Sequence, residues 1–167
     1  MYTVSCCHGD EQLPNLCLCQ VVMVDADTYR PRAGHAAVVS NDCLYVFGGT
    51  TLNSLLDELS IYCVTSLTWQ TVSRSEPWPA ARHGHAMGLI DKRIFVYGGV
   101  MSDGSTSNEL WMYLISDNKW QMIDSQSSVS PPPVSGHTLT AVDNRCHLFS
   151  SFITVEFSLI CNATIDQ

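Results

Sequence analysis

The sequence predicts an all-β protein built from four-stranded antiparallel sheets that repeat along the chain, and three observations support this fold class. Two long stretches of the chain match each other when His35 is placed over His85, 50 residues later. Each stretch holds short runs of β-branched and aromatic residues that are separated by turn residues. In both stretches a pair of glycines follows the second run. Four-stranded units repeated at this spacing are typical of the blades of a β-propeller.

The two copies agree over most of their length. A run that ends in Gly-Gly starts nine residues after each histidine, and one inserted residue then aligns a Glu-Leu segment and a Trp-Gln pair. The matched segments are 31–35 with 81–85, 44–49 with 94–99, 57–62 with 108–113, and 69–70 with 120–121.

Each copy is expected to form four strands. The first strand and the second are joined by short turns at 40–42, 91–93 and 143–145, which contain Asn or Asp. These residues suit tight hairpins because they tolerate a left-handed backbone. The expected strands are 36–39, 44–47, 59–64 and 69–72 in the first copy, with 110–115 and 120–123 in the second.

Partial copies flank the two complete ones. A third copy starts before His137, but Ser150 and Ser151 replace its glycines and the pattern then ends. Counting back from His35 places residues 19–22 in the position of a last strand, with Cys19 in place of the tryptophan. We therefore expect about two full and two partial repeats. The expected division is an N-terminal segment 1–30 with the last strand of a preceding blade, repeats at 31–80, 81–132 and 133–149 (partial), and a divergent tail 150–167 without a third or fourth strand.

The repeated residues carry a resemblance to a known family. The pattern Arg-x-Gly-His, aromatic-Gly-Gly, Asp/Asn-Glu-Leu, Tyr and Trp resembles the kelch repeat over residues 31–149. Residues 107–113 are further similar to the propellers of attractin and of leucine-zipper-like regulators. The resemblance implies a kelch-type β-propeller fragment with four-stranded antiparallel blades.

Most of the repeated residues have a structural explanation. Arg32 and Arg82 are expected to tie strands together through carbonyl hydrogen bonds or ring stacking. The large Trp and Tyr side chains can fill the wedge between blades. Three histidines recur at one repeat position, so they are expected on successive blades and not around one ion. They are His35, His85 and His137. Glu58 and Glu109, with Asp57, are expected to be solvated or hydrogen-bonded in the turn before the third strand.

Charge and hydropathy exclude several partners. The net charge is −8 and the 8 Lys and Arg residues are scattered, which disfavours nucleic acid and anionic membrane surfaces. No apolar run is long enough to span a membrane. The apolar stretch 16–24 follows Asp10 and Glu11 and is a poor signal peptide, so a cytoplasmic location is expected. The alternatives are a secreted protein or the extracellular part of a membrane protein, in which the sequon at Asn162 would matter.

The eight cysteines leave three interpretations open, namely thiols packed in strands, disulfides, or a metal cluster. The first is favoured because no C-x-x-C pair is present and buried thiols behave as small apolar residues. We predict no catalytic, cofactor-binding or metal-binding residues. The copper radical oxidases of the kelch fold are a remote alternative, since the required Tyr–Cys crosslink does not suit the neighbours Tyr62 and Cys63, which face opposite sides of a strand.

The predicted function is a non-catalytic scaffold that binds protein partners through its blade loops. The candidate loops are 50–56, 100–107 and 74–80, and the linkers 73–80 and 125–133 are rich in Pro and Ser. Trp78 either contacts a partner or packs onto the adjacent blade. The main alternative is a fragment of an extracellular attractin-like receptor propeller.

The number of repeats raises a further question. Closed propellers use about four to eight blades, more than these repeats supply. The expected explanations are a segment of a longer protein, assembly with other propeller segments or with itself, or truncation after Phe149.

Overall fold

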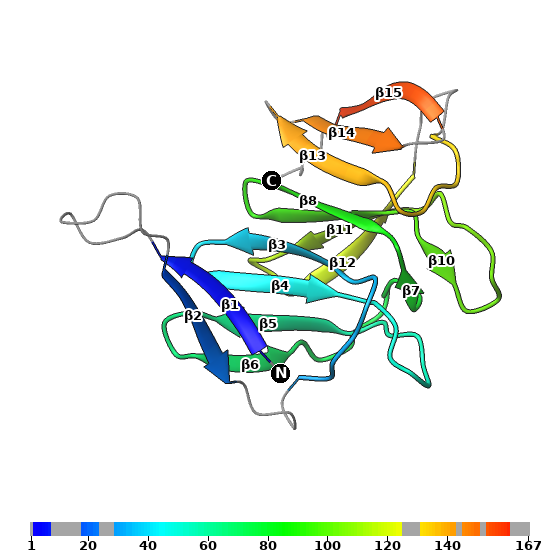
Figure 1. The fold of residues 1–167 in the computed structure, drawn as a ribbon. Helices are drawn as coiled ribbons and strands as arrows, with labels where there is room; N and C mark the ends of the chain where they lie inside the picture. The colour runs from blue at the N-terminus through cyan, green and yellow to red at the C-terminus, as the bar shows by residue number, and fades with distance from the viewer. Residues whose placement is uncertain are drawn as a thin grey trace. The chain divides into compact units, whose positions relative to one another are not determined.

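The computed structural model describes residues 2–7, 18–23, 29–124, 131–142, 145–150 and 153–160. Over these residues every regular element is a β-strand (Figure 1). The chain divides into two units, Met1–Pro31 and Arg32–Gln167.

The first unit contains an antiparallel pair of strands, β1 (Tyr2–Cys7) and β2 (Leu18–Met23). In this pair Cys6 is opposite Cys19. The strand predicted over 19–22 lies within β2. Its assignment to a preceding blade stays a prediction.

The second unit contains two four-stranded antiparallel sheets with the strand order expected of propeller blades. Blade 1 consists of β3 (Ala36–Ser40), β4 (Cys43–Phe47), β5 (Leu59–Cys63) and β6 (Thr68–Thr71). Blade 2 consists of β8 (Ala86–Ile90), β9 (Arg93–Tyr97), β11 (Leu110–Leu114) and β12 (Lys119–Ile123). The kelch-type fold class predicted from the sequence is confirmed, and the expected strands agree with these bounds to within one residue at each end.

A third sheet holds β13 (Thr138–Val142), β14 (Arg145–Ser150) and β15 (Ile153–Ile160). The expectation that no third strand follows Phe149 is wrong, because β15 pairs with β14. The pairing runs from Arg145 opposite Ile160 to Ser150 opposite Ile153. The segment 153–160 is rich in β-branched and aromatic residues, which favour a strand even where the glycine pair is missing. The predicted domain boundary at this point remains a prediction.

The hairpin turns have the backbone that their residues predict. Asn41 and Asp91, which follow the first strands of blades 1 and 2, have φ values of 52° and 55°. Both lie in the left-handed region, where Asn and Asp are tolerated best among residues with a side chain. The equivalent turn of the third sheet, Asp143 and Asn144, lies outside the described residues.

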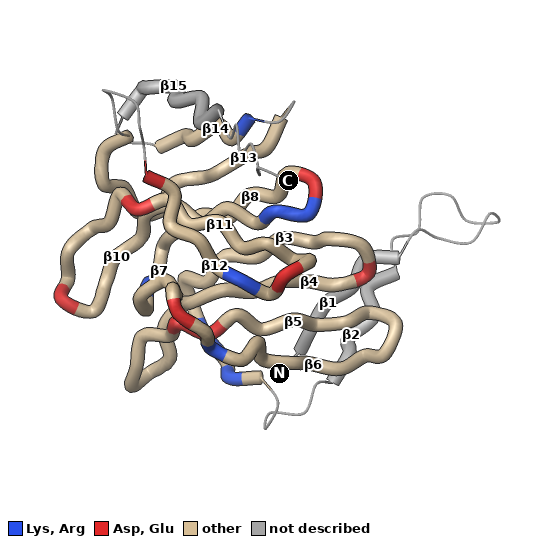
Figure 2. The backbone as a smooth tube through the Cα atoms, turned by 180° about the vertical axis from the view of Figure 1, so that it is seen from behind, with Lys and Arg blue, Asp and Glu red and all other residues tan. Residues whose placement is uncertain are grey.

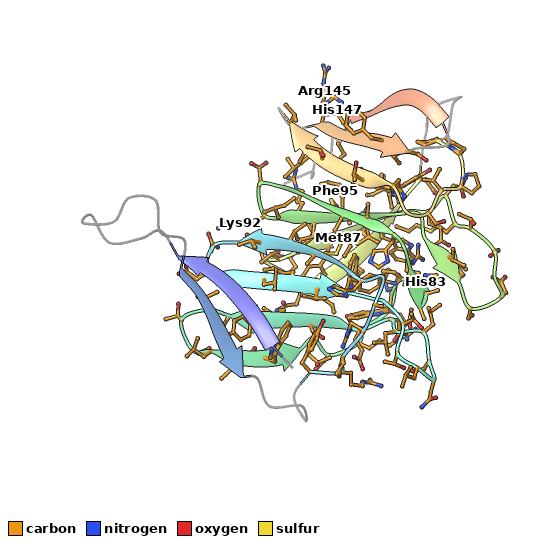
Figure 3. All side chains as sticks on the ribbon, viewed as in Figure 1. His83, Met87, Lys92, Phe95, Arg145 and His147 are labelled. Atoms are coloured by element: carbon orange, nitrogen blue, oxygen red, sulfur yellow. The ribbon has the colours of Figure 1, made fainter. Side chains whose placement is uncertain are left out.

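The sheets stack face to face, with β3, β8 and β13 as neighbouring strands. The side chains of Met87 and Phe95 lie on opposite faces of blade 2 (Figure 3). Met87 belongs to a core shared with blade 1, and Phe95 to a core shared with the third sheet. Large aromatic side chains fill the first core, namely Tyr45, Phe47, Trp78, Trp111, Tyr113 and Trp120. The position of these rings between blade 1 and blade 2 agrees with the prediction that aromatic residues fill the wedge between blades.

Backbone hydrogen bonds also connect successive sheets. The Gly84 N–H donates to the Gly34 carbonyl at 2.8 Å, and the Gly136 N–H donates to the Gly84 carbonyl at 2.7 Å. We call this row the glycine ladder. Its three residues have φ values of 64°, 66° and 66°, which only glycine adopts at little cost.

Two very short strands extend this region. They are β7 (Arg82–His83) and β10 (Val100–Met101), and they pair with each other. The loop after blade 2's second strand is thereby attached to the segment that enters blade 2.

Candidate functional site

The antiparallel connections gather the predicted binding loops at one end of the strands. Loops 50–56 and 100–107 join the second and third strands of their blades, and loop 73–80 leaves β6 at the same end. The hairpin turns lie at the other end. In Figure 3, His83 marks the loop end of blade 2 and Lys92 marks its turn end. We call the two ends the loop rim and the turn rim.

Loop 50–56 is held in one shape by its own side chains. The Thr51 N–H donates to the Ser54 carbonyl at 2.8 Å, and the Ser54 N–H donates to Thr51 Oγ1 at 3.0 Å. The two hydroxyl groups are also within 3.0 Å of each other. Leu52, between them, is fully exposed at 103% relative accessibility. The loop therefore presents an apolar side chain to solvent on a braced backbone.

Loop 100–107 has a similar internal brace. Asp103 Oδ1 accepts hydrogen bonds from the Ser105 side chain at 2.6 Å and from the Ser105 N–H at 2.9 Å. These bonds lower the pKa of Asp103, so the carboxylate is charged over the whole neutral range. Residues 102–106 are exposed.

Loop 73–80 divides into an exposed part and a buried part. Residues 73–77 are exposed, and Arg74 forms ion pairs with Asp57 and Glu76. Trp78 is only 7% exposed, and its indole N–H donates to the Asp57 carbonyl at 2.7 Å. Its ring also meets the Trp120 ring edge-on. Of the two roles considered for Trp78, packing onto the adjacent blade is confirmed, and a side chain this buried offers little surface to a partner.

Acidic residues surround these loops without forming one cluster. Within residues 29–124, every Asp and Glu lies outside the strands, in loops and turns (Figure 2). Within these residues the negative charge is therefore carried at the two rims and not on the strands.

Buried arginines support the loop rim from below. The Arg82 side chain is 0% exposed, and its guanidinium donates to the Gly98 carbonyl at 3.2 Å and to Glu109 at 2.6 Å. Its Nε–H donates to the Ala80 carbonyl at 3.0 Å. Burial raises the pKa of Glu109, but the hydrogen bonds from Arg82 and Trp111 outweigh it, so the net pKa lies below the ordinary value.

Blade 1 repeats the same arrangement. Arg32 donates to the Gly48 carbonyl at 3.3 Å and forms an ion pair with Glu58 at 3.1 Å. The predicted carbonyl hydrogen bonds of Arg32 and Arg82 are therefore confirmed. Glu58 and Glu109 were expected to be either solvated or hydrogen-bonded, and both are hydrogen-bonded.

The three repeated histidines occupy equivalent places on successive sheets. The ring of His85 packs at Gly48 and meets Phe47 edge-on, and His137 does the same at Gly98 and Tyr97. His35, the first of the series, is exposed. This placement agrees with the structural role predicted for them. His83 and His147 lie on β7 and β14, while His8 lies outside the described residues.

Protonation of His85 is expected to destabilise the fold. Burial, followed by the charge of Arg82, lowers the pKa of His85 to about 3. The unfolded chain takes up this proton near pH 6.5, so stability is complete above that pH and is lost as the pH falls toward 3. Urea denaturation between about pH 6.5 and pH 5 should show a loss from His85 that steepens from about 0.7 to about 1.4 kcal/mol per pH unit. Carboxylates contribute little in this range.

The matched variant is H85N, which lacks the titrating ring and should show a shallower slope. Burial also lowers the pKa of His137, and partial desolvation together with the charge of Arg32 lowers that of the more exposed His35, so part of the slope should remain. Equal slopes in the two proteins would contradict the assignment to His85.

The neighbours Tyr62 and Cys63 face different surroundings. The Tyr62 ring packs against Trp69 at 5.1 Å, whereas the Cys63 Sγ lies 3.0 Å from the Cys43 Sγ. Within the part of the chain that the structure describes, no three His, Cys, Asp or Glu side chains gather in a way that suits a metal ion. The described residues also contain no helix long and apolar enough to cross a membrane.

Together, the stacked sheets and the loop rim define a segment of a kelch-type β-propeller. Residues 44–155 match the family described as the Attractin/LZTR1 beta-propeller, and the chain belongs to this family. The narrower resemblance seen in residues 107–113 is thereby confirmed.

Individual relatives agree with this assignment. The chain is 35% identical over 104 residues to the human Multiple epidermal growth factor-like domains protein 8, a match that covers 60% of this chain and 4% of the relative. It is 28% identical over 141 residues to Kelch repeat-containing protein 2 of Saccharomyces cerevisiae, a match that covers 75% of this chain and 16% of the relative. It is 35% identical over 131 residues to Tip elongation aberrant protein 1 of Schizosaccharomyces pombe, a match that covers 74% of this chain and 11% of the relative. The chain thus spans only a small part of each of these relatives.

Proposed function

We propose that this chain is a non-catalytic scaffold that recruits a protein partner through its loop rim. The observation that carries the proposal is the braced loop 50–56 with the fully exposed Leu52. A rigid backbone lowers the entropy that binding costs, and an apolar side chain at its tip can fill a pocket on a partner. Two Arg–Glu pairs with buried arginines fix this rim to the sheets, so the loop sequences can vary while the frame stays constant.

Kelch relatives support the proposal at the level of the family. The relatives share the repeat, and this chain places its repeated residues in packing and hydrogen bonds and not in a reactive cluster. Exposed loop side chains such as Leu52 are not used in this packing, and the loops are where partner recognition is expected. Catalysis, a cofactor and a bound metal are not part of the proposal.

Two exposed leucines allow a matched test of the proposed rim. Leu52 lies on the loop rim, and Leu67, 61% exposed, lies on the turn rim. A photo-crosslinking residue at each position in turn, used in cells, should join a partner from position 52 and not from position 67. Purified partner should then bind the L52D variant at least about tenfold more weakly than wild type, the loss expected for a contact of about 1.4 kcal/mol.

The L67D variant is the control and should bind like wild type. A partner that tolerates L52D but not L67D would place the binding surface on the turn rim and overturn the proposal. Both changes are at exposed loop or turn positions, so circular dichroism should show the fold unchanged in each.

We further propose a cytoplasmic location, with the extracellular receptor-like propeller as the alternative. Trapping thiols with an alkylating reagent at the moment of lysis distinguishes them. Cysteines alkylated in full support the cytoplasmic location, whereas disulfides that stay closed in the presence of reduced glutathione support the extracellular one.

A further inference from the structure

Two cysteines of blade 1 face each other across neighbouring strands. Cys43 begins β4 and Cys63 ends β5, and the two are direct register partners. Their sulfur atoms are 3.0 Å apart. Both thiols are free and both residues are partly exposed.

The hydrogen-bond register of β4 and β5 favours a disulfide bond between Cys43 and Cys63. The Val64 N–H donates to the Asp42 carbonyl at 2.8 Å, and the Gly48 N–H donates to the Glu58 carbonyl, so every second pair along these strands is hydrogen-bonded. Cys43 and Cys63 occupy the alternating, non-hydrogen-bonded position. At such positions the Cα atoms are about 4.5 Å apart and the side chains are closest. This spacing lies within the range of about 4.4–6.8 Å that a disulfide requires.

The fold itself does not require cysteine at these positions. Blade 2 places Arg93 opposite Leu114 in the same register, and the third sheet places Arg145 opposite Ile160. The sheets pair in the same way with either set of residues. The cysteine pair is therefore a feature of blade 1 and not of the repeat.

We propose that Cys43 and Cys63 are a redox-active pair that small-molecule disulfides, such as oxidised glutathione, convert to a cross-strand disulfide between β4 and β5. Partial exposure admits the oxidant, in contrast to Cys146, which is fully buried. This inference is independent of the partner proposed for the loop rim.

The reaction proceeds by two thiol–disulfide exchanges. One cysteine thiolate attacks a sulfur of oxidised glutathione, which forms a mixed disulfide and releases one glutathione thiolate. The second cysteine thiolate then attacks the protein sulfur of that mixed disulfide and displaces the other glutathione. The protein loses two electrons and two protons, and one oxidised glutathione becomes two reduced glutathione molecules. The hydrogen bond with Cys63 raises the pKa of the Cys43 thiol, so the exchange should be slow at neutral pH and should become faster as the pH is raised and more thiolate forms.

The test treats the native protein with oxidised glutathione, quenches it with acid and alkylates it in denaturant. We expect the Cys43 and Cys63 side chains to be protected from alkylation and joined to each other. Trypsin leaves both in one peptide, because no Lys or Arg lies between residues 33 and 73, so a second cut after Glu58 is needed to show the link. Reduction should restore both thiols.

Oxidation should also raise the melting temperature, since the bond closes a loop between positions 20 residues apart. The matched control is the double variant C43R/C63L, which carries the residues of blade 2 at the same register. Its melting temperature should not respond to oxidised glutathione, whatever its starting value.

Three results would overturn the proposal. The first is full alkylation of Cys43 and Cys63 in native protein under conditions that oxidise the denatured chain. The second is a glutathione adduct on either cysteine that does not resolve to a disulfide. The third is a link formed elsewhere, for example between Cys6 and Cys19, which are opposed in β1 and β2, while Cys43 and Cys63 stay free.

Discussion

Replacing Arg82 with alanine is expected to lower the free energy of unfolding by about 2–4 kcal/mol, because a completely buried side chain and its hydrogen bonds to two carbonyl groups and to the partly exposed Glu109 are lost. Arg82 is completely buried and donates to the carbonyl groups of Ala80 and Gly98 as well as to Glu109. Alanine removes these donors together and leaves a cavity beneath the loop rim. The loss is a large share of the about 5–15 kcal/mol that stabilises an ordinary domain. Urea or thermal denaturation measures it.

Arg74 provides the matched control for this prediction. It also forms two ion pairs with carboxylates, Asp57 and Glu76, but its side chain is 54% exposed. Exposed pairs contribute little, so R74A should leave the denaturation midpoint unchanged. R82K keeps the positive charge but not the planar guanidinium group, so its free energy of unfolding should lie between those of wild type and R82A. If R82A were no less stable than R74A, the arginine brace would not support the rim.

A methyl group at Gly98 is expected to destabilise the protein by about 3 kcal/mol or more, because two costs add. The backbone at Gly98 is left-handed, with φ of 69°, which costs an L-residue about 1–2 kcal/mol. A Cβ there would also lie 2.4 Å from the Val134 carbonyl oxygen and 2.9 Å from His137 Cε1. The contact is mainly with backbone, which cannot rotate away. The third sheet would have to shift relative to blade 2.

Gly104 separates the two costs. It has φ of 81°, but a Cβ at Gly104 would meet nothing within 4 Å. G104A should therefore lose only the conformational part, about 1–2 kcal/mol, in the same denaturation experiment. Equal losses in G98A and G104A would show that the close packing at Gly98 costs nothing.

The architecture of the blades was predictable because the same residues recur at the same positions in two copies of the repeat. Asn41 and Asp91, the Gly-Gly pairs and the recurring arginines keep their places in both copies, so spacing alone located the strands and turns. The same comparison identified His85 and His137 as structural. Recurrence at one position of each copy separates a residue that builds every blade from one that serves a single site.

Features present in only one copy were harder to predict. Trp78 is outside the matched positions, and its burial depends on Asp57 and on Trp120 of the next blade. The strand β15 was missed because the glycine marker before it is absent, although its residues favour a strand. The Cys43–Cys63 pair follows from strand register, which a count of cysteines and their spacings does not contain. In the site, the sequence located the loops but not Leu52, since exposure depends on how Thr51 and Ser54 close the loop.

The glycine ladder gives the stack of sheets a direction. At Gly84, the N–H bonds to the preceding sheet and the carbonyl to the following one, so donor and acceptor point opposite ways around the axis. A further propeller segment, or a second copy of this chain, could continue the row only if the donor side of its first sheet met the acceptor side of the last sheet here. Such head-to-tail joining is heterologous and yields rings or open filaments, whereas a two-fold dimer would set donor against donor. Any closed assembly of identical copies made by extending these sheets should therefore have cyclic symmetry, with the number of copies set by the curvature between neighbouring blades.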